Sequence, residues 1–252
     1  MEILSDQELI RYNRQIILRD FDFDGQEALK QASILIIGAG GLGCASSQYL
    51  VTAGVGQLTL VDDDVVELSN LQRQVLHQDQ DVGVLKTQSA QASLSQLNPY
   101  TQIATVDKRL DDKELAQLIA SHQLVIDASD NLATRNQLNR LCYNSKTPLV
   151  SGAAIRMEGQ ISVFTYQDDE QPCYQCLSAL FGDTNLSCVE TGVMAPVVGI
   201  IGAMQAMEAI KVIASYGQVK QGKLLILDAL SMSWRELNLN KMPNCPVCGN
   251  QS

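Results

Sequence analysis

Short apolar runs alternate with amphipathic stretches over the first 150 residues. The runs ILII, LTLV and LVIDAS, at 34–37, 58–61 and 124–129, predict buried strands, and a further strand is expected at 102–106. Helices are expected between them, at 42–53, 86–97 and 111–121. Such alternation predicts an α/β fold with a Rossmann-like, doubly wound parallel sheet.

The chain changes character at both ends of this alternation. Ser5 and Glu8 have capping-box spacing, which predicts a helix through about Leu18 as an arm ahead of the core. Beyond Pro148, the segments PLVSGAA, GQISVFTY and KLLILDAL are β-like, with one apolar helix expected at 198–214. We expect them to extend the same sheet with antiparallel strands. The most loop-like segment is 181–190.

Composition limits the class of protein. With 252 residues and 46% hydrophobic content, the chain can bury one sizeable core, so we expect a single domain. The net charge of −10 disfavours general binding to nucleic acid or to an anionic membrane. The amino terminus has no apolar signal-peptide core, and the apolar stretch 192–204 contains Pro196 and is short for a membrane span. A cytoplasmic protein is expected.

A glycine fingerprint predicts a nucleotide site. Gly38, Gly40 and Gly43 are spaced G-x-G-x-x-G between a strand and a helix, where backbone N–H groups can approach phosphate. Asp62 ends the next strand, where a carboxylate can accept hydrogen bonds from ribose hydroxyls; otherwise it is an ordinary strand-end acid. This fingerprint alone does not separate ATP from NAD.

Polar residues further along the chain favour ATP. Ser69, Asn70 and Arg73 follow the second strand, and Lys86 stands at a predicted helix start, so cations can converge on a triphosphate; each is otherwise a surface residue. Asp130, followed by Asn131 at a strand's carboxyl end, is the first choice for holding Mg²⁺. Asp127 is the rival, or a turn cap. The acids Asp63, Asp64 and Asp79 are expected to be solvated.

Seven cysteines in a reducing compartment point first to metal or reactive chemistry. Cys173 and Cys176 form one C-x-x-C motif and Cys245 and Cys248 form another, which predicts a structural, four-cysteine zinc site rather than redox pairs. We expect zinc to hold the C-terminal tail to the body of the protein. The remaining thiols and both histidines are expected as follows: Cys44 and Cys142 in the core, Cys188 in an exposed loop, and His77 and His122 isolated and structural.

Several of these segments together resemble one family. The segments GAGGLG at 38–43, SNLQRQ at 69–74, SDN at 129–131 and SGAAIRMEGQ at 151–160, with Asp62 and Lys86, resemble the MoeB/ThiF family, relatives of ubiquitin-activating enzymes. The opening LSDQELIRYNRQ and the stretch VMAPVVGIIGAMQAMEAIK are similar to the branch that serves molybdopterin synthesis. The resemblance covers nearly the whole chain.

The resemblance implies an activity and a partner. It implies ATP-dependent adenylation of the C-terminal glycine of a small ubiquitin-like sulfur carrier, the small subunit of molybdopterin synthase. It implies nucleotide and catalytic roles for Gly41, Asp62, Asn70, Arg73, Lys86 and Asp130, and a homodimer in which Arg14 reaches the partner's ATP. Residues 1–30 would be the arm, 31–150 the nucleotide-binding half and 151–252 the carrier- and zinc-binding half.

Some alternatives stay open at this point. Cys188 is placed like a cysteine that in ThiF bonds covalently to the carrier, or it is an incidental loop thiol. The same chemistry on the thiamin-pathway carrier, a nicotinamide-dependent oxidoreductase, and a zinc-binding scaffold that holds nucleotide without turnover are the rival functions. No rhodanese-like segment follows Cys248, so a separate sulfur-donor protein is expected.

Overall fold

One mixed sheet organises the molecule. The computed structural model describes residues 3–180 and 192–249, and within them eight strands lie in the order β3-β2-β1-β4-β5-β6-β7-β8. The first five are parallel, and β6, β7 and β8 join antiparallel. The strands are β1 (Ser33–Ile37), β2 (Gln57–Val61), β3 (Gln102–Val106), β4 (Leu124–Asp127), β5 (Leu149–Ile155), β6 (Glu158–Phe164), β7 (Lys223–Asp228) and β8 (Ser233–Asn238). The predicted fold class is confirmed.

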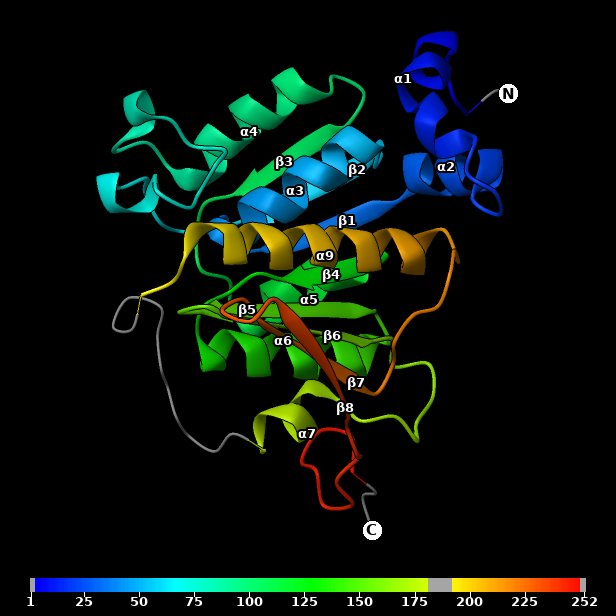
Figure 1. The fold of residues 1–252 in the computed structure, drawn as a ribbon, viewed down its shortest axis with the longest axis vertical. Helices are drawn as coiled ribbons and strands as arrows, with labels where there is room; N and C mark the ends of the chain where they lie inside the picture. The colour runs from blue at the N-terminus through cyan, green and yellow to red at the C-terminus, as the bar shows by residue number, and fades with distance from the viewer. Residues whose placement is uncertain (1–2, 181–191, 250–252) are drawn as a thin grey trace.

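Helices cover both faces of this sheet (Figure 1). On one face lie α3 (Gly41–Ala53), α4 (Lys86–Leu97) and α9 (Ala195–Ile213); on the other lie α5 (Asp112–Ala120), α6 (Leu132–Ser145) and α7 (Tyr174–Ser178). Along β1, Ile34 and Ile36 pack into the first layer and Leu35 and Ile37 into the second. Both faces of a central parallel strand are therefore buried, which explains the uninterrupted apolar run.

The long apolar helix α9 begins earlier than the sequence indicates. It starts at Ala195 rather than near 198, with Pro196 in its first turn, where a missing N–H costs nothing. Its 19 residues are by length and composition enough to cross a membrane, which the shorter apolar stretch at 192–204 did not suggest. However, α9 packs against α3, β5 and β6, and a side chain at Gly202 would lie 2.5 Å from the Leu42 carbonyl oxygen. It is therefore a helix of the protein core.

The N-terminal arm comprises two helices, α1 (Asp6–Ile16) and α2 (Asp22–Gln31). The predicted capping box is present, because the Ser5 hydroxyl accepts from the Glu8 N–H and the Glu8 carboxylate accepts from the Ser5 N–H. Gln15 donates to the carbonyl of Ala53, the last residue of α3. The arm therefore lies at the end of α3 that is furthest from the glycine fingerprint (Figure 1).

Two elements carried no usable sequence signal. Every position of the edge strand β8 is exposed. Because neither face of the strand packs on the core, its sequence has no alternation of apolar and polar residues that would identify it. Helix α2 begins without a side-chain cap, and its apolar residues do not form a clear helical face.

Candidate active site

A cleft of about 660 Å³ opens at the carboxyl ends of β1, β2 and β4. The strand order reverses there, because β2 and β3 lie on one side of β1 and β4 lies on the other. Open α/β sheets bind ligands at such a switch point, since the loops after the two strands diverge. The residues that the sequence predicts and that line the cleft are Gly38, Gly40, Gly41, Asp62, Asn70, Arg73, Lys86, Asp130 and Asn131.

Glycine is required at each position of the fingerprint for a different physical reason. Gly38 has φ +103°, a left-handed conformation that favours glycine. A Cβ at Gly43 would lie 1.9 Å from the Gly38 carbonyl oxygen, so this glycine lets α3 start directly beneath the turn and does not line the cleft. A Cβ at Gly40 would meet only the Gln74 side chain, at 3.7 Å. Gly40 therefore leaves the backbone open to a ligand.

Asp62 is tied to the glycine turn. One of its carboxylate oxygens accepts from the Ala39 N–H at 2.7 Å and the other accepts from the Asp64 N–H at 2.9 Å. Burial raises the pKa of Asp62, while the Ala39 N–H and the nearby Lys86 act in the opposite direction. The carboxylate thus fixes the turn as well as facing the cleft.

Lys86 is buried at the entrance to α4 and extends to the acidic side of the cleft. Its Nζ lies 2.7 Å from the Asp64 carboxylate, and the residue is only 7% exposed. Asp64 is solvated as expected, with its side chain 67% exposed, and it also pairs with Lys86. A buried ammonium held by an exposed carboxylate is available to an anionic ligand that replaces or joins that partner.

Asn70 and Arg73 lie on the segment after β2. The side-chain amide oxygen of Asn70, Oδ1, accepts from the Glu67 N–H and closes the 3₁₀ turn Leu68–Asn70. Arg73 donates to the Ser69 carbonyl at 3.1 Å and remains half-buried in the cleft wall. The Ser69 hydroxyl donates to Glu67 and is not part of the lining. Of these predicted residues, the structure therefore brings Asn70 and Arg73 to the cleft, but not Ser69.

The two candidate acids at the end of β4 are in opposite environments. Asp127 is 1% exposed, and its carboxylate accepts from the Ser129 N–H and from the hydroxyls of Ser129 and Ser151. Asp130 is exposed in the cleft wall, where its carboxylate accepts one hydrogen bond from the described residues, a long one from the Asn131 amide at 3.5 Å. Its oxygens are therefore free for a metal ion, whereas those of Asp127 already shape the turn.

Lys108, Arg109 and Gln74 are among the side chains of the lining that were not anticipated. Lys108 and Arg109 follow β3 and add two cations to the rim, and Gln74 is buried beside Gly40. The rule that ligands lie beyond the carboxyl ends of parallel strands could have identified Lys108 and Arg109. Gln74 belongs to the SNLQRQ segment that was already singled out.

Arg14 lies outside its own chain's cleft. It is exposed on α1, which packs at the C-terminal end of α3, whereas the cleft lies at the N-terminal end. Thirteen residues of helix separate these ends by roughly 20 Å. Any contact between Arg14 and nucleotide would have to be made in another copy of the chain.

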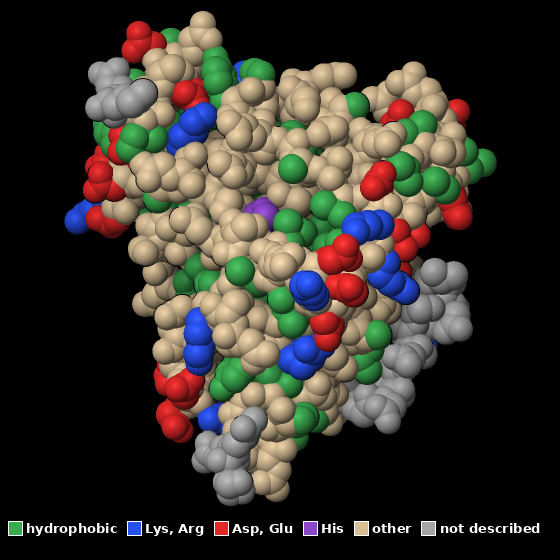
Figure 2. Space-filling view, turned by 180° about the vertical axis from the view of Figure 1, so that it is seen from behind, with side chains coloured by type: hydrophobic (Ala, Val, Ile, Leu, Met, Phe, Trp, Pro, Cys, Tyr) green, Lys and Arg blue, Asp and Glu red, His purple; other side chains and the backbone are tan. Residues whose placement is uncertain are grey.

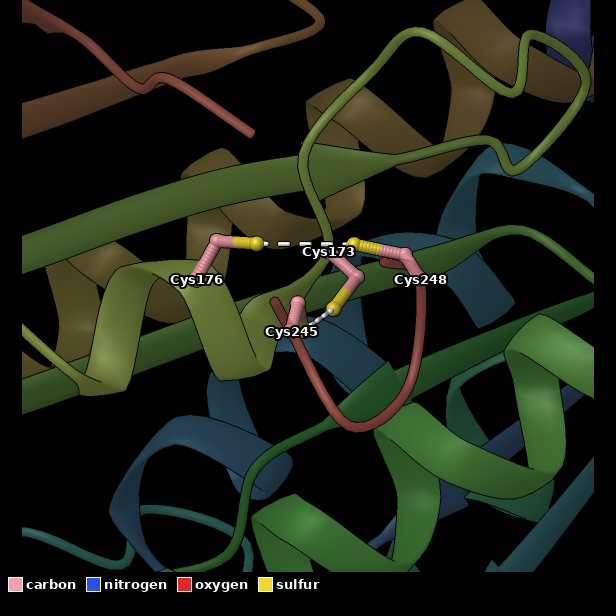
Figure 3. Close-up of side chains that lie close together, drawn as sticks. All are labelled: Cys173, Cys176, Cys245 and Cys248. Carbon is pink, nitrogen blue, oxygen red and sulfur yellow. Dashed lines mark hydrogen bonds between the residues drawn. The ribbon is translucent and has the colours of Figure 1, made fainter. Parts of the chain in front are cut away.

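The four predicted zinc ligands converge (Figure 3). The sulfur atoms of Cys173 and Cys245 are 3.6 Å apart, those of Cys176 and Cys248 are 3.4 Å apart, and all four lie within 4.8 Å of one another. All four residues are buried. The close pairs join the two motifs, which is unlike a redox C-x-x-C pair, and both distances exceed the ~2.05 Å of a disulfide.

These thiols fit a zinc ion. Tetrahedral Zn–S bonds of about 2.3 Å place sulfur atoms just under 4 Å apart, close to the observed spacing. The Asn139 amide donates to Cys173 at 3.5 Å and the Met242 N–H donates to Cys176 at 3.4 Å, as outer hydrogen bonds to zinc thiolates do. The ion would occupy all four ligands and would connect α7 to the C-terminal tail.

The remaining thiols and histidines divide into confirmed and corrected expectations. Cys44 and Cys142 are core residues, and burial raises the pKa of the Cys44 thiol to about 12. The expectation that His77 is isolated is wrong: it lies 3.7 Å from Cys44 Sγ and is linked through a serine to an acid. His122 contacts Thr59 and a carbonyl, as a structural histidine does. Cys188 and the loop-like segment 181–190 lie outside the described residues.

Charge on the surface is mixed. Figure 2 shows Lys and Arg side chains next to Asp and Glu side chains, and the described residues of this face form no separate basic surface. The basic side chains that matter here, Arg73, Lys86, Lys108 and Arg109, are gathered in the cleft instead. Such a distribution suits a small anionic ligand better than a polyanion.

Known proteins similar to this chain match most of its length. The ThiF family model matches residues 12–247. The molybdopterin-synthase adenylyltransferase of Escherichia coli (strain K12) is 62% identical, covering 99% of this chain and 100% of that protein, and that of Salmonella typhimurium (strain LT2) is 59% identical with the same coverage. Among solved structures, E. coli MccB with MccA-N7isoASN is 25% identical and superimposes with a TM-score of 0.79, covering 90% of this chain and 70% of that one.

Proposed function

The chain belongs to the ThiF family, and we propose that it is an adenylyltransferase that uses ATP to activate the C-terminal glycine of the small subunit of molybdopterin synthase. The product would be an acyl-adenylate, ready to receive sulfur in molybdenum cofactor biosynthesis. Relatives that are 56–62% identical over 94–99% of the chain carry the name molybdopterin-synthase adenylyltransferase.

One observation of the molecule carries the proposal. A single cleft combines an open glycine turn, a strand-end carboxylate at Asp62, and the cations Arg73 and Lys86, with Asp130 opposite them. Adenylation needs these elements, because a carboxylate must approach an α-phosphate while negative charge accumulates on pyrophosphate. A nicotinamide enzyme needs only the glycine turn and the ribose-binding acid.

The residues divide the reaction between them. The backbone of Gly38–Gly41 would receive the phosphates and Asp62 the ribose hydroxyls. An oxygen of the carrier's terminal carboxylate attacks the α-phosphorus, the bond to the bridging oxygen breaks, and pyrophosphate departs with the electron pair. Arg73 and Lys86 would neutralise the transferred and departing groups, without a nucleophile from the enzyme.

Mg²⁺ accompanies the nucleotide in this proposal. The exposed oxygens of Asp130 fit such an ion, since magnesium is commonly held by one or two carboxylates together with phosphates and water. When bound, it supplies charge neutralisation between the phosphates.

The first test is ATP–pyrophosphate exchange with purified protein, Mg²⁺ and the molybdopterin carrier. Exchange that requires the carrier is expected, and Asp130→Asn should lower its rate by at least a hundredfold if the acid holds the metal. Asp79→Asn is the matched control, because Asp79 is exposed and outside the cleft lining. Absence of exchange with active carrier would refute the adenylating function.

We infer a homodimer in which Arg14 completes the partner's site, following the family resemblance and the distance of Arg14 from its own cleft. Mixing Arg14→Ala and Asp130→Asn proteins tests this arrangement. Random pairing would make half of the dimers mixed, each with one intact site, so about a quarter of the wild-type activity should return. If Arg14→Ala alone is inactive, absence of recovery with proven subunit exchange would refute the cross-subunit arrangement; full activity of Arg14→Ala alone would place Arg14 outside the reaction.

Zinc would hold the tail without taking part in the chemistry, and a separate protein would donate the sulfur. The runner-up is the same reaction on the thiamin-pathway carrier, which would appear as exchange with that carrier alone. Tighter binding of NADH than of ATP would favour an oxidoreductase. Binding of ATP without exchange would favour a passive scaffold.

A further inference from the structure

A buried histidine lies directly behind the glycine turn. His77 is 6% exposed, and its Nε2 is 3.2 Å from the carbonyl oxygen of Ala39, the residue between Gly38 and Gly40. The N–H of the same residue donates to Asp62. Both polar groups of Ala39 are therefore held from outside the turn, one by Asp62 and one by the imidazole.

The other side of the imidazole leads to an acid. Its Nδ1 lies 2.9 Å from the Ser89 hydroxyl, which donates to the Asp81 carboxylate at 2.7 Å. Ser89 is buried in α4, and Asp81 ends the 3₁₀ turn Asp79–Asp81. A continuous line of polar contacts thus runs from Asp81 through Ser89 and His77 to the backbone that faces the phosphates.

This line is one proton short when His77 is neutral. Three contacts each require a proton: His77 to Ser89, Ser89 to Asp81, and His77 to the Ala39 carbonyl. A neutral imidazole and a hydroxyl supply only two. If the proton of the neutral ring is on Nδ1, the unprotonated Nε2 lies against the Ala39 carbonyl oxygen, and neither atom can donate. If the proton is on Nε2, both Nδ1 and Asp81 need a hydrogen bond from the single Ser89 hydroxyl proton. The imidazolium satisfies all three contacts.

The charged groups around the ring act in opposite directions. Burial is the largest influence on the pKa of His77 and lowers it, and the positive charge of Lys86 lowers it further. The Ala39 carbonyl, Asp81 and Asp62 raise it. The net effect is a pKa below the ordinary value of histidine. The Cys44 thiol, which also faces the ring, donates weakly to the Ala39 carbonyl at 3.4 Å. Burial therefore disfavours the charged ring in a site whose hydrogen bonds favour it.

We propose that His77 is a positioning residue for the phosphate-facing turn, and that its ring takes up a proton when nucleotide binds. Phosphates at Gly38–Gly41 bring negative charge close to the far side of the Ala39 carbonyl, and they also engage the positive charge of Lys86. Both effects favour the imidazolium. The protonated ring then donates to Ala39 and to Ser89 together and fixes the turn in its binding conformation.

The inference rests on the proposed nucleotide site, and calorimetry separates the two. Binding of MgATP without carrier is measured near neutral pH in buffers of different ionisation enthalpy, which reports protons taken up. The nucleotide phosphates also titrate, so the result is the difference in the number of protons taken up on binding between the wild type and His77→Gln. A Gln amide can donate to the Ala39 carbonyl but does not titrate. If ATP fails to bind to the wild type, the proposed function fails; the inference itself is judged on proteins that bind.

The expected result is a proton uptake that His77→Gln abolishes, together with tighter ATP binding at lower pH in the wild type and a flatter profile in the variant. His77→Leu, which can donate to neither neighbour, should raise KM for ATP by about tenfold, the cost of one charge-assisted hydrogen bond, and leave KM for the carrier unchanged. His77→Gln should recover most of that loss. His122→Gln is the control, because His122 is the chain's only other histidine and lies outside the cleft lining. Equal proton uptake in the wild type and His77→Gln would overturn the proposal.

Discussion

Two glycines of the fingerprint should respond in opposite ways to the same substitution. Gly43→Ala places a Cβ 1.9 Å from the Gly38 carbonyl oxygen and 2.9 Å from its carbon, so the turn and the first turn of α3 must separate by about an ångström. Gly40→Ala places a Cβ no closer than 3.7 Å to the Gln74 side chain, at a backbone conformation (φ −78°) that alanine adopts.

The magnitudes follow from these contacts. Forced overpacking destabilises a fold by up to about 3 kcal/mol, whereas alanine stabilises the interior of a helix by about 1 kcal/mol relative to glycine. Gly43→Ala should therefore lower the free energy of unfolding by about 2 kcal/mol. Gly40→Ala should change it by less than about 0.5 kcal/mol, because nothing clashes. Its methyl group stands where phosphate would approach, so it should weaken ATP binding while the fold is unchanged.

Urea denaturation and ATP titration of both variants provide the assay. If Gly43→Ala is as stable as the wild type, α3 does not approach the turn as closely as the structure shows. If Gly40→Ala binds ATP normally, the open backbone at Gly40 does not face the ligand.

Three further predictions concern the rest of the molecule. Asp127→Asn should lower the free energy of unfolding by about 2 kcal/mol, because a buried carboxylate that accepts three hydrogen bonds is lost; the same change at Asp130 should leave urea denaturation unaltered. Burial is the largest influence on Glu8 and raises its pKa, but the bonds from Lys30 and Ser5 outweigh it, so the folded value lies below 4.5. The stabilisation by Glu8 is therefore fully present above pH 4.5 and is lost as the pH falls through the pKa of Glu8 in the folded protein. Glu8→Gln should flatten this acid dependence in denaturation curves. A strong chelator should lower Tm by about 10 °C, restored by zinc, in differential scanning calorimetry; an unchanged Tm would argue against a structural ion at Cys173, Cys176, Cys245 and Cys248.

Local patterns were sufficient for most of the core. The strands β1, β2 and β3 and the helices α3 and α4 lie within a residue or so of their expected bounds, because apolar runs, glycine turns and caps act over a few residues. The spacing of the cysteines likewise predicted which four would meet. The exposed edge strand β8 was missed, since its pairing with β7 depends on backbone hydrogen bonds that any side chain allows.

The candidate site shows the same division. The sequence identified Asp62, Lys86 and Asp130 by their places beside strands and helices, and the structure brings all three to one cleft. It ranked Asp130 ahead of Asp127, three residues away, but the exposure and hydrogen-bond partners that distinguish the two acids appear only in the structure.

The alternation of strands and helices, the glycine turn and the set of thiols could be predicted from local patterns, because each depends on neighbours within a few residues or on residue type. Three features follow only from the packing of distant segments: serines enclose Asp127, Arg14 stands at the far end of α3 from its own cleft, and His77 joins Asp81 to the backbone of Ala39. The partners in those contacts are separated along the chain and meet only when the helices pack on the sheet. Burial and proton sharing are properties of that packing, so no local pattern records them.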